Sequence, residues 1–429
     1  MQSAPLQSAN GAVDPAEGRT DRVVYRRGTH RALAPADTWA WLRPMLTDFG
    51  VTRVADLTGL DTIGVPVFQA VRPAARTVSV SQGKGLSADA ARVSAAMEAV
   101  ELWHAEQPLT GFRCTAAELD LPYPVEALHL ADGSFVHPDL PLDWLPATDL
   151  GPGSGSSSGN EIGGGAGTGT AVPLALVQLD HTSRPEWDPP LFHATSNGLA
   201  GGNTVAEATA HALAELLERD SLARLRAAPA GSAGPVRARR LDLATVDAPE
   251  CREVLDRFAA AGAGVEVLVV DDDPACFEAR LRSAGHPAVF TGSGSHLDPA
   301  VALARALTEA AQSRLTAIAG ARDDLPELLF RPRLGPPPTG ATAPRAVPVG
   351  GDEPWSAVSA GDRRTSGDLA ADVDRLAAAA RRRGGFAPLR VVLPTPAGVP
   401  VVKVIGPGLR FDARTEVAHP GRSATGGPR

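Results

Sequence analysis

Aromatic residues make up only 4% of this 429-residue chain, and cysteine occurs three times. The core must therefore be built mainly from Ala, Val and Leu. The cysteines, Cys114, Cys251 and Cys276, lie far apart and form no CxxC pair. This spacing argues against a structural zinc site or a disulfide framework and fits a reducing cytoplasm. None of them sits in a Gly-rich turn or beside a histidine, which disfavours a catalytic cysteine.

The chain also lacks long apolar runs and blocks of one charge. No stretch approaches the ~20 apolar residues that a membrane span needs. The polar start, residues 1–20, has no apolar core of a secretion signal. The net charge of −8 is spread over interspersed acidic and basic residues, so nucleic acid is not an expected partner. We expect a cytoplasmic protein without a membrane partner, in which Arg381–Arg383 form a solvated helix end.

Composition divides the chain into one large domain with polar appendages. Stretches rich in Gly, Ser, Thr and Pro predict flexible loops at residues 151–170 and 331–353. The predicted divisions are a disordered tail at residues 1–22, an N-terminal segment at 23–64, the main domain at 65–411 and a mobile tail at 412–429.

Three segments without internal Gly or Pro predict long helices, at residues 88–106, 204–227 and 299–319. Ser87 and Asp298 are the expected N-caps, and Gly320 is the expected stop. A further helix over residues 37–49 should be interrupted by Pro44. Short strands are expected at residues 53–57, 65–70 and 77–80.

Two of these helices carry paired carboxylates. Glu98 and Glu101 are three residues apart, as are Glu215 and Glu218, so each pair projects from one helix face. Two such faces brought together would need a cation, and Mg²⁺ takes carboxylate and phosphate oxygens. The alternative is that glutamate is a good helix former on a solvated face. The small apolar neighbours of Glu98 and Glu101 favour a buried helix instead.

Polar, Gly-rich segments precede the same two helices and are read as loops. In Ser81–Gly85, Lys84 stands between two glycines, where it offers a point charge to a phosphate. The spacing of a Walker A loop is absent. Taken alone, this segment is more typical of an ordinary turn than of a phosphate site, and residues 196–203 likewise need no ligand to explain them.

The third helix carries Arg305, Glu309, Gln312 and Arg314. Arg305 and Glu309, four residues apart, are typical of a helix salt bridge. The alternative is that this helix contacts a nucleotide, with Gln312 and Arg314 as donors to its phosphates or base.

Taken together, these motifs resemble the three nucleotide-binding signatures of the YcaO superfamily. They read Ser94-x-x-x-Glu98-x-x-Glu101, Asn203-x-x-x-Glu207-x-x-x-His211-Ala212-Leu213-x-Glu215-Leu216-x-Glu218-Arg219-Asp220, and Glu309-x-x-Gln312-Ser313-Arg314. The segments Ser81-x-Gly83-Lys84-Gly85, Ser196–Ala200, Gly294–Pro299 and Val402–Leu409 fit the same pattern. The first signature usually ends Glu-Arg, and Leu102 here removes one phosphate contact.

The resemblance implies an α/β fold in which mixed sheets and helices surround a nucleotide cleft that binds ATP and Mg²⁺. By the resemblance, Mg²⁺ would be held by Glu98, Glu101, Glu215 and Glu218. Phosphates would be contacted or the nucleotide positioned by Lys84, Ser94, Arg219, Gln312 and Arg314. The nucleoside would be contacted by Asn203 and Glu207, with Ser196 or Asn197. No catalytic residue beyond this site is assigned.

Enzymes of this family activate a backbone amide of a precursor peptide: a nucleophile adds to the carbonyl, and the oxyanion is phosphorylated by ATP and leaves as phosphate. The attacking group is a Cys, Ser or Thr side chain (azolines), sulfide (thioamides) or an amine (amidines). Azoline-forming members commonly end in a PxP tail, which residues 424–429 do not resemble.

The stretch from residues 25–31 through Gly83–Gly85 resembles YcaO proteins that work beside a TfuA-like partner. Thioamide formation with that protein or another sulfur donor is therefore the first expectation, and a homodimer is expected from the family. Alternatives are an azoline-forming cyclodehydratase, an ATP-dependent ligase or kinase, and a non-catalytic scaffold. The last should have lost some of the four carboxylates, and all are present.

Overall fold

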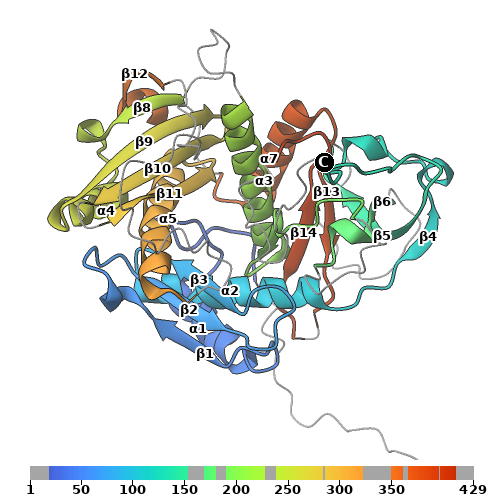
Figure 1. The fold of residues 1–429 in the computed structure, drawn as a ribbon, viewed down its shortest axis with the longest axis horizontal. Coiled ribbons are helices and arrows are strands. Elements are labelled where there is room, and N and C mark those ends of the chain that lie inside the picture. Colours follow the sequence, from blue (N-terminus) through green and yellow to red (C-terminus); the bar gives the residue numbers. More distant parts are fainter. Residues whose placement is uncertain are drawn as a thin grey trace, which may run out of the picture.

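The computed structural model describes residues 19–152, 169–179, 190–227, 238–283, 286–321, 349–360, 366–395 and 397–411. The predicted C-terminal tail and most of the predicted N-terminal tail and two loops lie outside these residues. The described part is an α/β fold with three sheets, as expected (Figure 1). None of its helices is both long and apolar enough to span a bilayer.

The sheets differ in size and strand order. The three-stranded antiparallel sheet has the order β1 (Arg53–Asp56), β2 (Val67–Val71), β3 (Val80–Lys84). The five-stranded sheet has the order β11 (His286–His296), β10 (Ala275–Ser283), β9 (Ala263–Asp272), β8 (Ala238–Asp242), β12 (Val349–Pro354). The third has the order β4 (Phe112–Thr115), β5 (Pro141–Asp149), β13 (Leu389–Val392), β14 (Val401–Ile405), β7 (Leu199–Gly201), and β6 (Gly169–Pro173) pairs with β5.

The described helices are α1 (Pro35–Leu42), α2 (Ala88–Glu106), α3 (Val205–Ala227), α4 (Pro249–Ala260), α5 (Pro299–Ala319), α6 (Trp355–Ser359) and α7 (Leu369–Gly384). Helix α2 packs on β2 and β3, α5 packs on β10 and β11, and α3 packs on α7 and β14. In Figure 1, α3 stands between the two larger sheets. The three long helices that carry the predicted signatures therefore meet at the junction of all three sheets.

The predicted helix signals are confirmed at their ends. Ser87 accepts a hydrogen bond from the Ala90 N–H at 3.2 Å, and Asp298 accepts one from the Ala300 N–H at 2.9 Å. Gly320 closes α5 in the left-handed conformation, with φ of 59°. Pro44 lies in a 3₁₀ turn, Arg43–Met45, that follows α1, so the predicted interruption is also present.

The prediction of a loop at Ser81–Gly85 is wrong, because residues 80–84 form strand β3. Gly83 pairs with Phe68 of β2 and lies against α2. A Cβ atom on Gly83 would come within 2.0 Å of the Ala95 nitrogen. The glycine therefore serves close packing of a strand on a helix rather than a turn. Gly292 repeats this between β11 and α5, at 2.2 Å from the Ala310 nitrogen.

Three smaller predictions also need correction. Residues 19–22 of the predicted disordered tail are placed: the Arg19 guanidinium lies 3.7 Å from the ring centre of Trp41. The end of the predicted loop 331–353 belongs to β12, which pairs with β8 and is supported by an ion pair between Glu353 and Arg239 at 2.8 Å. Arg381 and Arg382 are exposed at the end of α7, as expected for a solvated helix end, whereas Arg383 is partly buried and bonds to Asp271 at 3.1 Å.

Candidate active site

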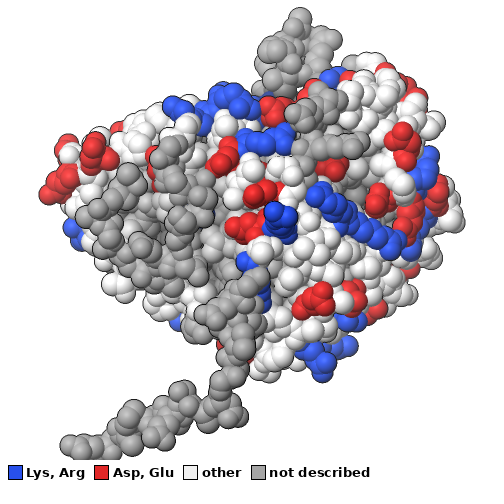
Figure 2. Space-filling view, turned by 180° about the vertical axis from the view of Figure 1, so that it is seen from behind, with Lys and Arg blue, Asp and Glu red and all other residues white. Residues whose placement is uncertain are grey.

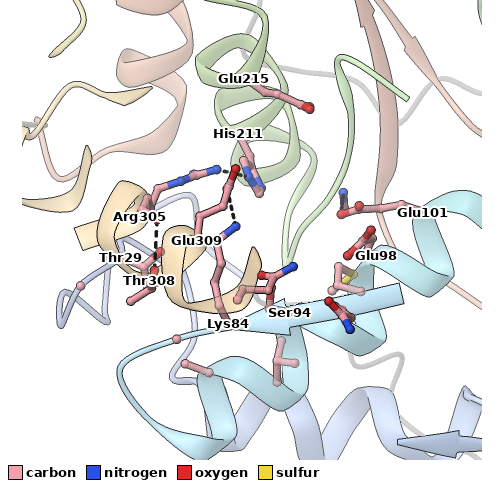
Figure 3. Close-up of a pocket in the computed structure, with 18 of the residues that line it drawn as sticks. Thr29, Lys84, Ser94, Glu98, Glu101, His211, Glu215, Arg305, Thr308 and Glu309 are labelled. Atoms are coloured by element: carbon pink, nitrogen blue, oxygen red, sulfur yellow. Dashed lines mark hydrogen bonds and ion pairs between the residues drawn. The ribbon is translucent and has the colours of Figure 1, made fainter. Parts of the chain in front are cut away.

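A cavity of about 740 Å³ opens between α2, α3 and α5. Strands β3 and β7 and the N-terminal segment around Gly28 and Arg31 complete its walls. Its volume is within the ~300–1,000 Å³ range of small-molecule sites in proteins. The three helices predicted to carry the signatures thus enclose one space (Figure 3).

All four predicted carboxylates line this cavity. Glu98 and Glu101 reach it from α2 and Glu215 reaches it from α3 (Figure 3). Glu218, one turn further along α3, also lines it. The prediction that two acidic helix faces converge is therefore confirmed. Their role as magnesium ligands stays a prediction.

Strand β7 and the residue just before it, Gly198, each hold one carboxylate through a backbone N–H group. The Gly201 N–H donates to Glu101 Oε1 at 2.6 Å, and the Gly198 N–H donates to Glu215 Oε2 at 3.2 Å. A Cβ atom on Gly201 would lie 2.7 Å from the Met97 sulfur, so glycine lets β7 approach α2 this closely. A third carboxylate, that of Glu218, accepts a hydrogen bond from the hydroxyl of Ser293 on β11 at 2.7 Å.

The carboxylates perturb one another in the enclosed space. The pKa of Glu101 is raised to about 8, chiefly by burial; the Gly201 hydrogen bond opposes this rise, and the charges of Glu98 and Glu215 add to it. Burial also raises the pKa of Glu215, with Arg219 opposing it and Glu218 adding to it. These environments disfavour the anions in the absence of a cation. A bound divalent cation would reverse this preference.

The donor set fits Mg²⁺ together with a polyphosphate. Within the described ranges, no three His, Cys, Asp or Glu side chains come close enough to enclose a metal by themselves. Mg²⁺ commonly keeps several waters and is bound through one or two carboxylates plus substrate phosphates. Carboxylates spread over two walls of a wide cavity suit that mode of binding.

Cationic and amide groups lie across the cavity from Glu98 and Glu101. Lys84 Nζ contacts Glu309 Oε2 at 2.6 Å (Figure 3), and Arg219 lies 3.6 Å from Glu215. Gln312 Oε1 is buried and has no hydrogen-bond partner among the described residues. Ser94, Ser196 and Glu207 also line the cavity. These groups are placed to meet a ligand that carries both acceptors and donors.

Arg314 is not part of the cavity lining, and its predicted nucleotide contact is not supported. It bonds to Asp61 at 2.9 Å and to the Ser283 hydroxyl. Residues two apart on a helix do not share a face, so Gln312 and Arg314 cannot both face the cavity.

Asn197 and Asn203 also lie behind the lining. Asn203 is 3% exposed and is engaged by Glu207 at 3.1 Å and by the Thr38 hydroxyl at 2.9 Å. The Asn197 carbonyl accepts from Lys403 at 2.7 Å. A direct nucleoside contact by the Asn203 amide would require its side-chain bonds to open, so Asn203 is placed to support the wall. The Lys403 bond is made by the Asn197 backbone and fixes the segment rather than the Asn197 side-chain amide.

Sequence reasoning did not place two further cationic side chains, Arg305 and Arg31, in the cavity wall. Arg305 does not pair with Glu309 as the helix spacing predicted; its Nη2 lies 2.8 Å from His211 Nε2 (Figure 3). Burial, followed by the Arg305 charge, lowers the pKa of His211. Arg31 also lines the cavity, 3.5 Å from Glu207. Because these contacts join segments far apart in sequence, helix spacing alone gives no signal for them.

The family model described as YcaO cyclodehydratase, ATP- and Mg²⁺-binding, matches residues 82–410. The chain belongs to the YcaO family. Its matched region contains α2, α3 and α5 with all four carboxylates, and this family binds ATP and Mg²⁺. The family assignment made from the motifs is thereby confirmed.

Curated relatives of this YcaO protein extend over most of its length. A protein of Mycobacterium tuberculosis strain H37Rv is 39% identical over 425 residues, which cover 96% of this chain and 88% of the relative. A protein encoded in the tfuA 3′ region of Rhizobium leguminosarum bv. trifolii is 38% identical, covering 71% and 70%. A Methanothermobacter thermautotrophicus protein is 34% identical, covering 88% and 94%.

Solved YcaO structures share the fold. YcaO from Methanopyrus kandleri, bound with AMPPCP and Mg²⁺, has a TM-score of 0.65 at 24% identity and covers 91% of this chain and 95% of that one. A heterocyclase in complex with substrate and cofactor has a TM-score of 0.67 at 23% identity. This match covers 89% of the present chain but only 53% of the heterocyclase.

The metal-free protein should become less stable as pH rises. Glu101 keeps its proton up to about pH 8 when folded, compared with 4.5 for the ordinary carboxyl. Between these values the folded state binds more protons than the unfolded state, so the free energy of unfolding falls with rising pH. Denaturant unfolding at several pH values with a metal chelator measures this. Glu101→Gln should flatten the profile, and parallel profiles for the two proteins would contradict the assignment.

Proposed function

We propose that this YcaO protein uses ATP and Mg²⁺ to activate a backbone amide of a ribosomally made precursor peptide. The observation that carries the proposal is the convergence of Glu98 and Glu101 with Glu215 and Glu218 on one cavity. The family description, as an ATP- and Mg²⁺-binding cyclodehydratase, supports it. The bound AMPPCP and Mg²⁺ in the Methanopyrus kandleri relative are consistent with it.

We assign the acidic side chains that face each other across the cavity to the metal, and most of the remaining polar side chains to the nucleotide. Glu98, Glu101, Glu215 and Glu218 would hold Mg²⁺. Lys84, Ser94, Arg219 and Gln312 would contact the phosphates or orient the nucleotide, with Ser196 and Glu207 at the nucleoside. Lys84 would exchange its ion pair with Glu309 for a phosphate oxygen, since an ammonium can turn between acceptors without a change of geometry.

When bound, ATP with Mg²⁺ supplies a phosphoryl group that turns the amide oxygen into a leaving group. The chain contributes positioning and electrostatics. The walls of the cavity hold the amide near the nucleotide, and the cationic side chains stabilise negative charge that develops on the oxygen. A cavity enclosed by three helices also limits the access of water, which would compete with the intended nucleophile.

Sulfur is the nucleophile we favour, which makes the product a thioamide. The support is the relative encoded in the tfuA 3′ region, which aligns with 71% of this chain. A TfuA-like protein would then serve as partner or as part of the sulfur supply, and the active form would be a homodimer. Acidic and basic side chains alternate over the face shown in Figure 2, so a protein partner with a similarly mixed surface would suit that face.

Azoline formation is the second candidate. It is favoured by the cyclodehydratase description of the family and by the fold shared with heterocyclases. The heterocyclase TruD has a TM-score of 0.56 at 26% identity, covering 75% of this chain and 46% of TruD. A non-catalytic scaffold is a weaker third candidate, because all four carboxylates are kept.

Replacing Glu98 or Glu215 by Gln should weaken binding of a Mg²⁺-loaded, non-hydrolysable ATP analogue by more than about tenfold, because each variant removes one negative charge from the metal site. Isothermal calorimetry measures the affinity. Glu266→Gln is the matched control: this glutamate lies on β9 and pairs with Arg240, outside the cavity. Unchanged affinity in the first two variants would count against the metal role.

The product distinguishes the two chemistries. With ATP, Mg²⁺, a sulfide source and a precursor peptide from the same gene neighbourhood, mass spectrometry should show one amide oxygen replaced by sulfur, together with release of phosphate. Loss of water at a Cys, Ser or Thr residue without sulfide would instead establish azoline formation. ATP turnover that leaves the peptide unchanged would contradict both.

A further inference from the structure

Lysine is rare in this chain, and its two lysine residues lie in or near the cavity wall. Of 41 basic Lys and Arg residues, only Lys84 and Lys403 are lysines. Lys84 lies in the cavity wall and fits the proposed phosphate site. Lys403 does not line the cavity and has no role in the function proposed above.

Lys403 is placed where an apolar residue would be expected. It lies on β14 between Val401 and Ile405, which both belong to the large apolar cluster around α2, and it is only 2% exposed. Taking an ammonium out of water at such a position is strongly unfavourable unless its donors are satisfied. The contacts that satisfy it therefore indicate what it does.

The ammonium clamps the segment that leads into β7. Lys403 Nζ donates to the carbonyl oxygens of Thr195 and Asn197, the latter at 2.7 Å. The next residue of β14, Val404, donates its N–H to the Gly198 oxygen at 2.8 Å. Residues 195–198 are thus tied to β14 by one side chain and one backbone bond.

Gly198 is held tightly by this arrangement. Its φ of 74° is in the left-handed region, and a Cβ atom there would lie 2.3 Å from the Val404 oxygen. Its N–H is the group that donates to Glu215, and β7 continues from it to Gly201, which donates to Glu101. Residues 195–198 therefore carry one of these donors, Gly198, and lead directly into the strand that carries the other, Gly201, which the β7–β14 pairing also holds.

We propose that Lys403 is a positioning residue of the metal site: by anchoring residues 195–198 it aims the Gly198 and Gly201 N–H groups at Glu215 and Glu101. This inference rests on the proposed role of these glutamates as magnesium ligands. Groups that orient metal ligands from behind change metal affinity by roughly 10–100-fold when they are removed.

The choice of lysine follows from the geometry of the clamp. Two carbonyls that belong to residues two apart on one bent segment must be reached from a single point. A compact ammonium donates in several directions from one atom, whereas a guanidinium presents a larger planar fork. This explains why a lysine stands here in a chain whose Lys and Arg residues are arginines except at positions 84 and 403.

The test is Lys403→Met, which keeps the length and apolar stem of the side chain and removes the ammonium. We expect the Mg²⁺ affinity of the complex with a non-hydrolysable ATP analogue to fall by about tenfold or more. Binding of the analogue without metal should fall by clearly less than this, because Lys84, Ser94 and Gln312 are untouched and only Ser196 of the proposed nucleotide contacts lies on the displaced segment. Calorimetric titration of the metal and of the nucleotide separates the two effects.

Arg390→Met is the matched control. Arg390 is 8% exposed and lies on the adjacent strand β13, opposite Val404, but makes no described contact with residues 195–198. It should leave the Mg²⁺ affinity within about twofold of the wild type. An equal loss in both variants would contradict the inference, because it would show a general effect of removing a buried cation.

Gly198→Ala provides a second perturbation if Lys403→Met does not fold. It moves the same segment away from Val404 while leaving Lys403 in place, and should reproduce the selective loss of Mg²⁺ affinity. Unchanged affinity in a folded variant of either kind overturns the inference. Failure of the wild type itself to bind Mg²⁺ with the analogue would instead overturn the proposed function.

Discussion

The site depends on the repulsion between carboxylates that two helices bring into one cavity. Glu98 and Glu101 on α2 and Glu215 and Glu218 on α3 would separate or stay protonated if nothing held them. The backbone of Gly198 and of β7 holds one carboxylate of each helix, since the Gly198 N–H donates to Glu215 and the Gly201 N–H donates to Glu101. The raised pKa of Glu101 shows that the protein maintains this arrangement at a cost, which a bound cation would remove.

Glycines let strands of the surrounding fold pack closely against the helices that line the cavity. Glycines at positions 83, 201 and 292 stand where a single Cβ atom would collide with a neighbouring helix. Each lies beside one of the signature helices or between two of them. The close approach brings α2, α3 and α5 into contact with one cavity, and their apolar faces are correspondingly rich in alanine.

Much of this site could be predicted from the sequence, because its parts are local. The glutamate spacing, the caps at Ser87 and Asp298 and the stop at Gly320 depend only on neighbours along the chain. The predictions that were wrong concern partners distant in sequence. Gly83 was taken for a turn but packs on α2, and Arg305 meets His211 rather than Glu309. The nucleotide contact of Arg314 stays a prediction, and its ion pair with Asp61 likewise has no signal along the chain.

The most direct test is a crystal structure of the protein with Mn²⁺ in place of Mg²⁺ and a non-hydrolysable ATP analogue. Anomalous scattering would locate each metal ion without reference to the protein coordinates. We expect a metal ion bound between the analogue's phosphates and carboxylates of both α2 and α3. Metal ions bound by only one helix, or outside the cavity, would contradict the account.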